Sequence, residues 1–153
     1  MSTPEERLAE MGLAVPEVPK PVAAYVPAVR NGTSILTSGQ LPMRSGELIT
    51  TGKVGAGVTE EEAYACAQQC ALNAIAAIKA EAGELSSVRI VKVVVFVASS
   101  PDFTGQPRVA NGASEMFGTV FGDAGVHARS AVGVAVLPLD APVEVEVLAE
   151  LTA

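Results

Sequence analysis

Three side chains near the end of the chain, Arg129, Glu144 and Glu146, have the chemistry to bind and transform a small acid. Arg129 follows a glycine-containing segment and precedes an apolar run, a position from which a side chain projects from the end of a sheet. A guanidinium group makes two parallel hydrogen bonds to a carboxylate and stays charged at physiological pH. Arg129 is therefore a candidate carboxylate-binding residue. The alternative is an ordinary surface arginine paired with one of the 17 acidic residues.

Glu144 and Glu146 alternate with valines in the last apolar run, Val143–Leu151. Successive side chains of a strand point to opposite faces, so both carboxylates share one face. They could form the hydrated face of an edge strand. In a partly dry cleft, one of them could instead hold or deprotonate a water molecule.

Other catalytic motifs are absent from the sequence. There is no glycine-rich phosphate loop and no G-x-S-x-G nucleophile motif. His127 is the one histidine, so a hydrolytic triad or a metal site has too few partners. Cys66 and Cys70 lie four residues apart in a helical pattern, too far apart for a good disulfide, and we interpret them as small buried residues. We expect no metal and no cofactor.

The composition indicates one globular domain. The chain has 153 residues, 49% of them apolar but only 4% aromatic, so its core is expected to consist of Val, Ala, Leu and Ile. The net charge is −7 and the basic residues are scattered, which disfavours nucleic acid as a partner. No apolar run is long enough to span a membrane, and the N-terminus does not resemble a signal peptide. We expect a cytoplasmic protein.

The hydrophobic pattern predicts an α+β fold, with a single sheet and two helices packed on one face. The order β-β-α-β-α-β-β follows from the ranges 22–30, 33–38, 59–83, 88–98, 109–121, 130–137 and 143–151. The strand at 88–98 is expected to be buried on both faces. Residues 1–21 form a short capped helix and a proline-rich arm, and residues 22–153 form the main domain. The uncovered face of the sheet predicts self-association.

Several motifs together resemble the signature of the Rid/YjgF family, which contains enamine/imine deaminases and was formerly called the L-PSP endoribonuclease family. The resemblance covers about residues 20 to 151. Its most specific part is the Ala-Arg-Ser block with a glutamate fifteen residues after the arginine. The motifs are Thr37-Ser38-Gly39-Gln40-Leu41-Pro42, Asp102-Phe103, Asn111, Ala128-Arg129-Ser130, Leu137-Pro138 and Val143-Glu144-Val145-Glu146.

The resemblance implies a chorismate-mutase-like homotrimer with sites in the clefts between subunits. The substrate would be a small 2-imino or enamino acid, as for 2-iminobutanoate/2-iminopropanoate deaminases, and the products a 2-oxo acid and ammonia. Arg129 would hold the substrate carboxylate and Glu144 the attacking water. The other expected substrate-binding residues are Tyr25, Ser38, Gly39, Asn111 and His127.

This chain departs from the family pattern near the expected cleft. Ala131 stands where a cysteine is usual, and His127 where a proline is usual. The stretch from Phe103 to Asn111 is longer than usual, and the N-terminal helix and arm are additions. Two alternatives to the deaminase therefore stay open. One is a trimeric binding module for small carboxylates without turnover, and the other is the endoribonuclease that the older family name implies.

Overall fold

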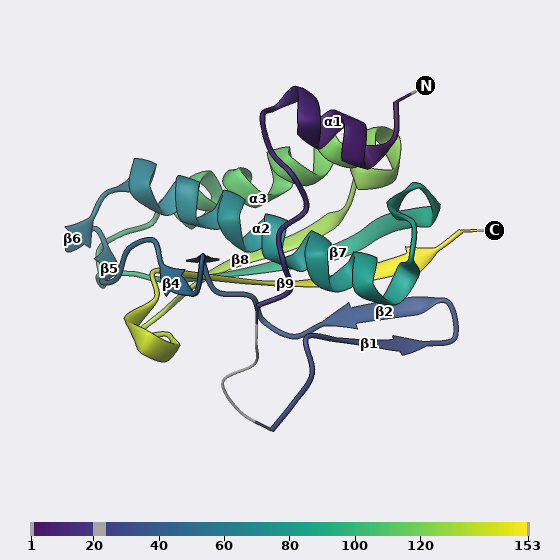
Figure 1. Cartoon of the computed structure of the whole chain (residues 1–153). Helices are drawn as coiled ribbons and strands as arrows, with labels where there is room; N and C mark the ends of the chain where they lie inside the picture. Colours follow the sequence, from purple (N-terminus) through teal and green to yellow (C-terminus); the bar gives the residue numbers. More distant parts are fainter. Residues whose placement is uncertain (1, 20–23, 153) are drawn as a thin grey trace.

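The computed structural model describes residues 2–19 and 24–152. It confirms the α+β prediction: a five-stranded sheet in the order β1-β2-β9-β7-β8 carries two long helices on one face (Figure 1). The helices are α2 (Glu60–Ala82) and α3 (Gln106–Phe121). The strands are β1 (Ala28–Asn31), β2 (Ser34–Thr37), β7 (Val88–Ala98), β8 (Ala128–Val134) and β9 (Val143–Leu151).

Small residues allow the two helices to lie close to the sheet and to each other. Helix α2 begins with a capping box, in which Thr59 and Glu62 satisfy each other's backbone N–H groups. A Cβ added to Gly112 of α3 would lie 2.3 Å from the carbonyl oxygen of Tyr64 in α2. Only glycine therefore fits at this crossing. Cys66 and Cys70 are free and buried in α2, as predicted, and burial raises the pKa of the Cys66 thiol to about 11.

Strand β9 lies at the centre of the sheet, antiparallel to both β2 and β7. The interpretation of Glu144 and Glu146 as the hydrated face of an edge strand is therefore wrong, because the long-range pairing of β9 with β7 places it in the middle. The expectation that β7 is buried on both faces is also wrong for the chain by itself. Its buried side chains alternate with half-buried ones such as Val94 and Phe96, since the helices cover one face only.

Three boundaries differ from the predicted ranges. Strand β8 begins at Ala128 and ends at Val134, because only these residues pair in parallel with β7. Helix α3 begins at Gln106, since Pro107 needs no N–H donor in the first helical turn. Of the first predicted strand, residues 28–30 are strand and residues 24–27 are not, while positions 22 and 23 lie outside the described residues.

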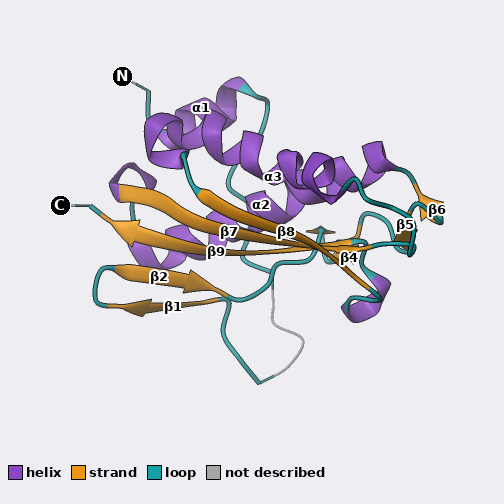
Figure 2. Ribbon diagram, turned by 180° about the vertical axis from the view of Figure 1, so that it is seen from behind, coloured by secondary structure: helices purple, strands orange, loops and turns teal. Residues whose placement is uncertain are grey.

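Shorter elements complete the chain. Strands β3 (Met43–Arg44) and β4 (Glu47–Leu48) form a two-stranded ribbon, and β5 (Lys53–Val54) pairs with β6 (Gly57–Val58). The 3₁₀ turns are η1 (Leu85–Ser87), η2 (Gly122–Gly125) and η3 (Pro138–Asp140). Helix α1 (Pro4–Glu10) packs beside α3 (Figure 2), where Arg7 Nη1 donates to the Val120 carbonyl at 3.1 Å. No helix in the described part of the chain is long and apolar enough to cross a membrane.

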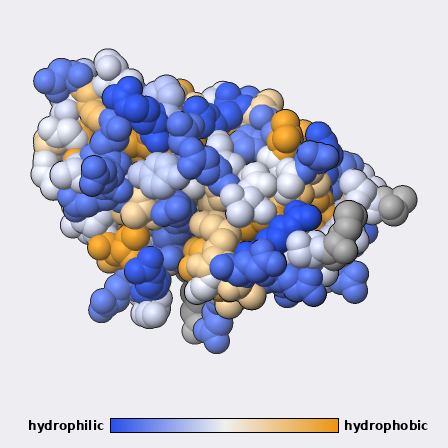
Figure 3. All heavy atoms as spheres, turned by 90° about the horizontal axis from the view of Figure 1, so that it is seen from above, coloured by the Kyte–Doolittle hydropathy of each residue, from blue (hydrophilic) through white to orange (hydrophobic). Residues whose placement is uncertain are grey.

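The two faces of the sheet differ in their cover. The side that carries the helices is mostly polar on its outer surface, with small separate apolar groups (Figure 3). The opposite face exposes Val29, Leu36 and Val132, whose side chains are 54%, 46% and 43% accessible. This second surface, the open sheet face, is thus apolar over three strands, β1, β2 and β8.

Candidate functional site

Arg129 is the second residue of β8, and its side chain lies on the helix-covered side of the sheet. It pairs with the buried Val93 of β7, so both residues point to that side. Its guanidinium contacts α3: Nη1 donates to Asn111 Oδ1 at 2.8 Å and to Ser114 Oγ at 3.2 Å. Nη2 donates to the carbonyl of Pro107 at 3.4 Å. The expected pair of Arg129 and Asn111 is therefore brought together.

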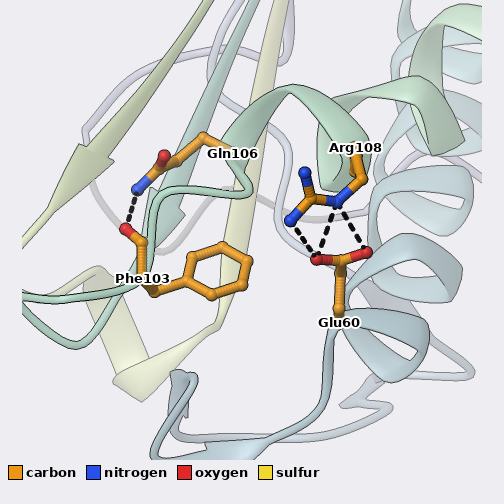
Figure 4. Close-up of polar contacts among 4 residues, drawn as sticks. All are labelled: Glu60, Phe103, Gln106 and Arg108. Atoms are coloured by element: carbon orange, nitrogen blue, oxygen red, sulfur yellow. Dashed lines mark hydrogen bonds and ion pairs between the residues drawn. The ribbon is translucent and has the colours of Figure 1, made fainter.

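The charge of Arg129 is left available by these contacts. All three acceptors are neutral, and within residues 2–19 and 24–152 Arg129 forms no ion pair. A guanidinium has five N–H donors, so two remain, Nε–H and one N–H of Nη2. Two donors are what a bidentate carboxylate requires. Arg108 behaves differently: its guanidinium is paired with both carboxylate oxygens of Glu60 (Figure 4).

His127 lies beside Arg129 but has protein partners at both ring nitrogens. Nδ1 lies 2.6 Å from the Gly125 carbonyl oxygen, and Nε2 lies 2.9 Å from Ser114 Oγ. The ring also meets Phe117 edge-on, with centroids 5.9 Å apart and planes at 84°. Both ring nitrogens of His127 therefore have protein partners, and its predicted contact with the substrate stays a prediction.

Beyond Arg129, the same face of β8 presents Ala131 and Gly133 to the first turn of α3. Gln106 occupies the space that Gly133 leaves: a Cβ there would lie 2.8 Å from Gln106 Nε2. The amide donates to the Phe103 carbonyl at 2.8 Å (Figure 4) and to Ser99 Oγ at 3.3 Å. Gln106 thus places a polar side chain beside Gly133, at the end of the row formed by Arg129, Ala131 and Gly133.

Glu144 lies on the other face of the sheet. It pairs with Phe96, and its carboxyl carbon lies 2.6 Å from where a Cβ on Gly39 would be, so the carboxyl group occupies the space that Gly39 leaves open. Burial, and secondarily the charge of Glu146, raise the pKa of Glu144. Ser38 next to Gly39 donates from Oγ to the Val26 carbonyl at 2.6 Å. The predicted group of Ser38, Gly39 and Glu144 is therefore assembled.

The predicted site residues consequently form two groups rather than one. Arg129, Asn111 and His127 lie between β8 and α3, whereas Ser38, Gly39 and Glu144 lie on the open sheet face. Tyr25 is 45% exposed and makes no hydrogen bond to either group within the described residues. Sequence reasoning missed Ser114 and Gln106. For Ser114 a signal existed, because it lies three residues after Asn111 and so on the same side of α3.

Comparison with known proteins shows a relationship over nearly the whole chain. Residues 5–151 match the family described as YjgF/chorismate mutase-like, a description that also names endoribonuclease. Protein TCP17 of Trypanosoma cruzi is 46% identical over 146 residues, which are 94% of this chain and 91% of that protein. The 2-iminobutanoate/2-iminopropanoate deaminase of Escherichia coli K12 is 36% identical over 137 residues, 90% of this chain and 94% of the enzyme.

Solved structures show the same fold. The crystal structure of a Shewanella oneidensis protein described as an endoribonuclease superimposes with a TM-score of 0.95 and 36% identity, covering 98% of this chain and 100% of the other. The Escherichia coli protein TdcF, crystallised with bound serine, superimposes with a TM-score of 0.65 and 25% identity, covering 90% of this chain and 94% of TdcF.

Proposed function

Because the chain belongs to the YjgF/chorismate mutase-like family, we propose that it is a hydrolytic deaminase of small 2-imino and enamino acids. The products are a 2-oxo acid and ammonia. The observation that carries the proposal is the state of Arg129: a fixed guanidinium with neutral partners and two N–H donors to spare. Relatives named as imine deaminases, and TdcF with its bound amino acid, support the same class of ligand.

In the proposed reaction, the substrate carboxylate binds the two remaining N–H donors of Arg129. A charge-assisted contact of this kind contributes about 1.5–3 kcal/mol. Water adds to the imine carbon, the carbon–nitrogen double bond opens, and the carbinolamine formed loses ammonia to give the 2-oxo acid. Glu144 passes one proton from the attacking water to the imine nitrogen, which gives the carbinolamine. It then passes the hydroxyl proton of the carbinolamine to the same nitrogen, which leaves as ammonia when the carbon–nitrogen bond breaks. The raised pKa of Glu144 suits a group that both accepts and donates a proton.

Arg129 and Glu144 serve one substrate only if two chains build the site, since within one chain they lie on opposite faces of the sheet. We therefore propose the homotrimer, with Arg129 from one protomer and Glu144 from its neighbour. The apolar open sheet face, with Val29, Leu36 and Val132 exposed, supports a second copy of the chain as its cover. Light scattering should then give about three times the 15.6 kDa chain mass. A monomer at micromolar concentration would contradict the shared site.

The deaminase activity is tested by generating the imine in place. An amino-acid oxidase produces the 2-imino acid, semicarbazide traps it, and the active protein should lower the yield of semicarbazone by converting the imine first. Arg129→Ala should lose this effect. Arg108→Ala is the matched control, because it removes an exposed arginine that is already paired with Glu60. Equal semicarbazone with and without the wild-type protein would refute the deaminase.

A binding module without turnover is the second candidate. It is favoured by the same separation of Arg129 from Glu144, because a carboxylate can bind at Arg129 without Glu144. Calorimetry with pyruvate distinguishes the two: in a binding module, Arg129→Ala abolishes binding while Glu144→Gln spares it, and neither wild type nor variant affects semicarbazone yield.

A further inference from the structure

His127 is linked to Arg129 through one intervening side chain, that of Ser114. We infer that His127 is a positioning residue: acting through the Ser114 hydroxyl, it fixes the orientation of the Arg129 guanidinium and thereby selects which N–H donors face the ligand. The role in ligand binding rests on the proposed function of Arg129. The hydrogen-bond relay itself does not, and it can be measured separately.

The proton position on His127 follows from the group that its Nδ1 meets. A backbone carbonyl can only accept a hydrogen bond, and the Gly125 carbonyl lies 2.6 Å from Nδ1. Nδ1 must therefore carry a proton. In the neutral ring, Nε2 is then unprotonated and acts as an acceptor. The carbonyl of Gly125 thus selects the tautomer of His127.

The tautomer of His127 also fixes the direction of the hydrogen bond between His127 and Ser114. Nε2 as an acceptor takes the hydroxyl proton of Ser114, whose Oγ lies 2.9 Å away. The lone pairs of Oγ then remain for the Nη1–H of Arg129 at 3.2 Å. Nη1 has two hydrogens, and the second goes to Asn111 Oδ1 at 2.8 Å. Both hydrogens of Nη1 are thereby bound, which leaves the other edge of the guanidinium for the ligand.

The packing around His127 holds this arrangement in place. Gly125 fits tightly against α3, where a Cβ would lie 2.2 Å from the Phe117 carbonyl oxygen, so its own carbonyl has little freedom. The ring of Phe117 meets the imidazole edge-on and limits its rotation. A neutral histidine also orients Arg129 without compensating its charge, whereas an acidic residue in the same place would form an ion pair and compete with a substrate carboxylate.

The tautomer is the first test, and it is independent of any activity. Because His127 is the one histidine of the chain, its two ¹⁵N ring resonances in the full-length protein are assigned without ambiguity. In the spectrum of the neutral ring, Nδ1 should appear protonated and Nε2 unprotonated. Ser114→Ala should move the Nε2 resonance and leave the Nδ1 proton in place. A protonated Nε2 with a bare Nδ1 would overturn the inference.

A double-mutant cycle tests the effect on binding, with calorimetry of pyruvate as the probe. His127→Ala and Ser114→Ala should each raise the dissociation constant by about 2- to 10-fold, the effect of one ordering hydrogen bond. Because the two residues act in series, the double variant should bind no more weakly than Ser114→Ala alone. If His127→Ala weakens binding by the same factor in both backgrounds, the residues act independently and the inference fails.

Conservative replacements separate positioning from packing. Gln can place an amide oxygen where Nε2 lies and accept from Ser114, whereas Asn reaches only the position of Nδ1. His127→Gln should therefore restore much of the affinity that His127→Ala loses, and His127→Asn should not. Equal affinities for both variants would contradict the relay. If wild type does not bind pyruvate, the proposed function of Arg129 fails, and the ¹⁵N measurement still decides the relay.

Discussion

The availability of the Arg129 charge can be tested by changing a single neighbouring atom. Asn111→Asp replaces the amide oxygen that accepts from Nη1 at 2.8 Å with a carboxylate oxygen of the same size and position. The guanidinium then acquires an internal ion pair. We expect the folded chain to be at least as stable as wild type, because a charged acceptor strengthens this hydrogen bond. Binding of a 2-oxo acid should weaken, because the ligand now approaches a compensated charge.

The expected loss of ligand affinity follows from the distance between the two carboxylates. Two carboxylates on different edges of one guanidinium lie roughly 6 Å apart, which corresponds to a repulsion of about 0.7 kcal/mol in water and about 3 kcal/mol at a surface dielectric constant near 20. The dissociation constant for pyruvate should therefore rise by about 3- to 100-fold. Half-molar salt should reduce this difference, since it screens the repulsion.

The assay is calorimetry at low and high salt, together with urea unfolding. Thr119→Asp is the matched control, because it adds the same charge to an exposed position of the same helix, eight residues further along α3. Unchanged pyruvate affinity for Asn111→Asp, or an equal loss for Thr119→Asp, would refute the reasoning that Arg129 binds the ligand with an uncompensated charge.

Three further predictions concern stability and its pH dependence, all measured by urea unfolding. The raised pKa of Glu144 means that the folded state favours its protonated form, so this glutamate costs stability as pH rises through its pKa. Glu144→Gln should therefore raise the free energy of unfolding at neutral pH. Its difference from wild type should vanish when the pH falls below the ordinary pKa range of a carboxyl group. A difference that does not change with pH would contradict the raised pKa. Gly112→Ala should destabilise by about 1–3 kcal/mol, because its Cβ would meet the Tyr64 carbonyl, whereas Gly118→Ala, with open space around it, should be neutral or stabilising. Thr59→Ala should cost about 1 kcal/mol through the lost cap of α2, and a cost near zero would mean that water replaces it.

Local signals in the sequence predicted most of the fold. The helical range 59–83, the apolar strand 88–98 and the alternation in Val143–Leu151 each depend on neighbouring residues, and all three appear in the structure as α2, β7 and β9. Strand order does not depend on neighbouring residues. β9 is central because it pairs with both β2 and β7, and this long-range pairing corrected the interpretation of Glu144 as an edge residue.

The candidate site was predictable in its parts but not in its arrangement. Arg129 and Glu144 were singled out by residue type and position, and Asn111 by the family resemblance. A strand register, however, decides which face of the sheet each strand side chain occupies, and a shift of one residue reverses it. The pairing of Arg129 with Val93 and of Glu144 with Phe96 puts them on opposite faces. A reaction that needs both residues on one substrate therefore requires a second chain.

The role of His127 shows why contacts matter more than residue type at such a site. From the sequence, a histidine two residues before Arg129 was expected to touch the substrate. In the structure its two ring nitrogens lie against Gly125 and Ser114, and Ser114 in turn contacts Arg129. Because the carbonyl of Gly125 selects the tautomer, the His127 ring accepts a proton from Ser114 rather than donating one. His127, held between Gly125 and Ser114, therefore supports the Arg129 guanidinium without competing for the ligand.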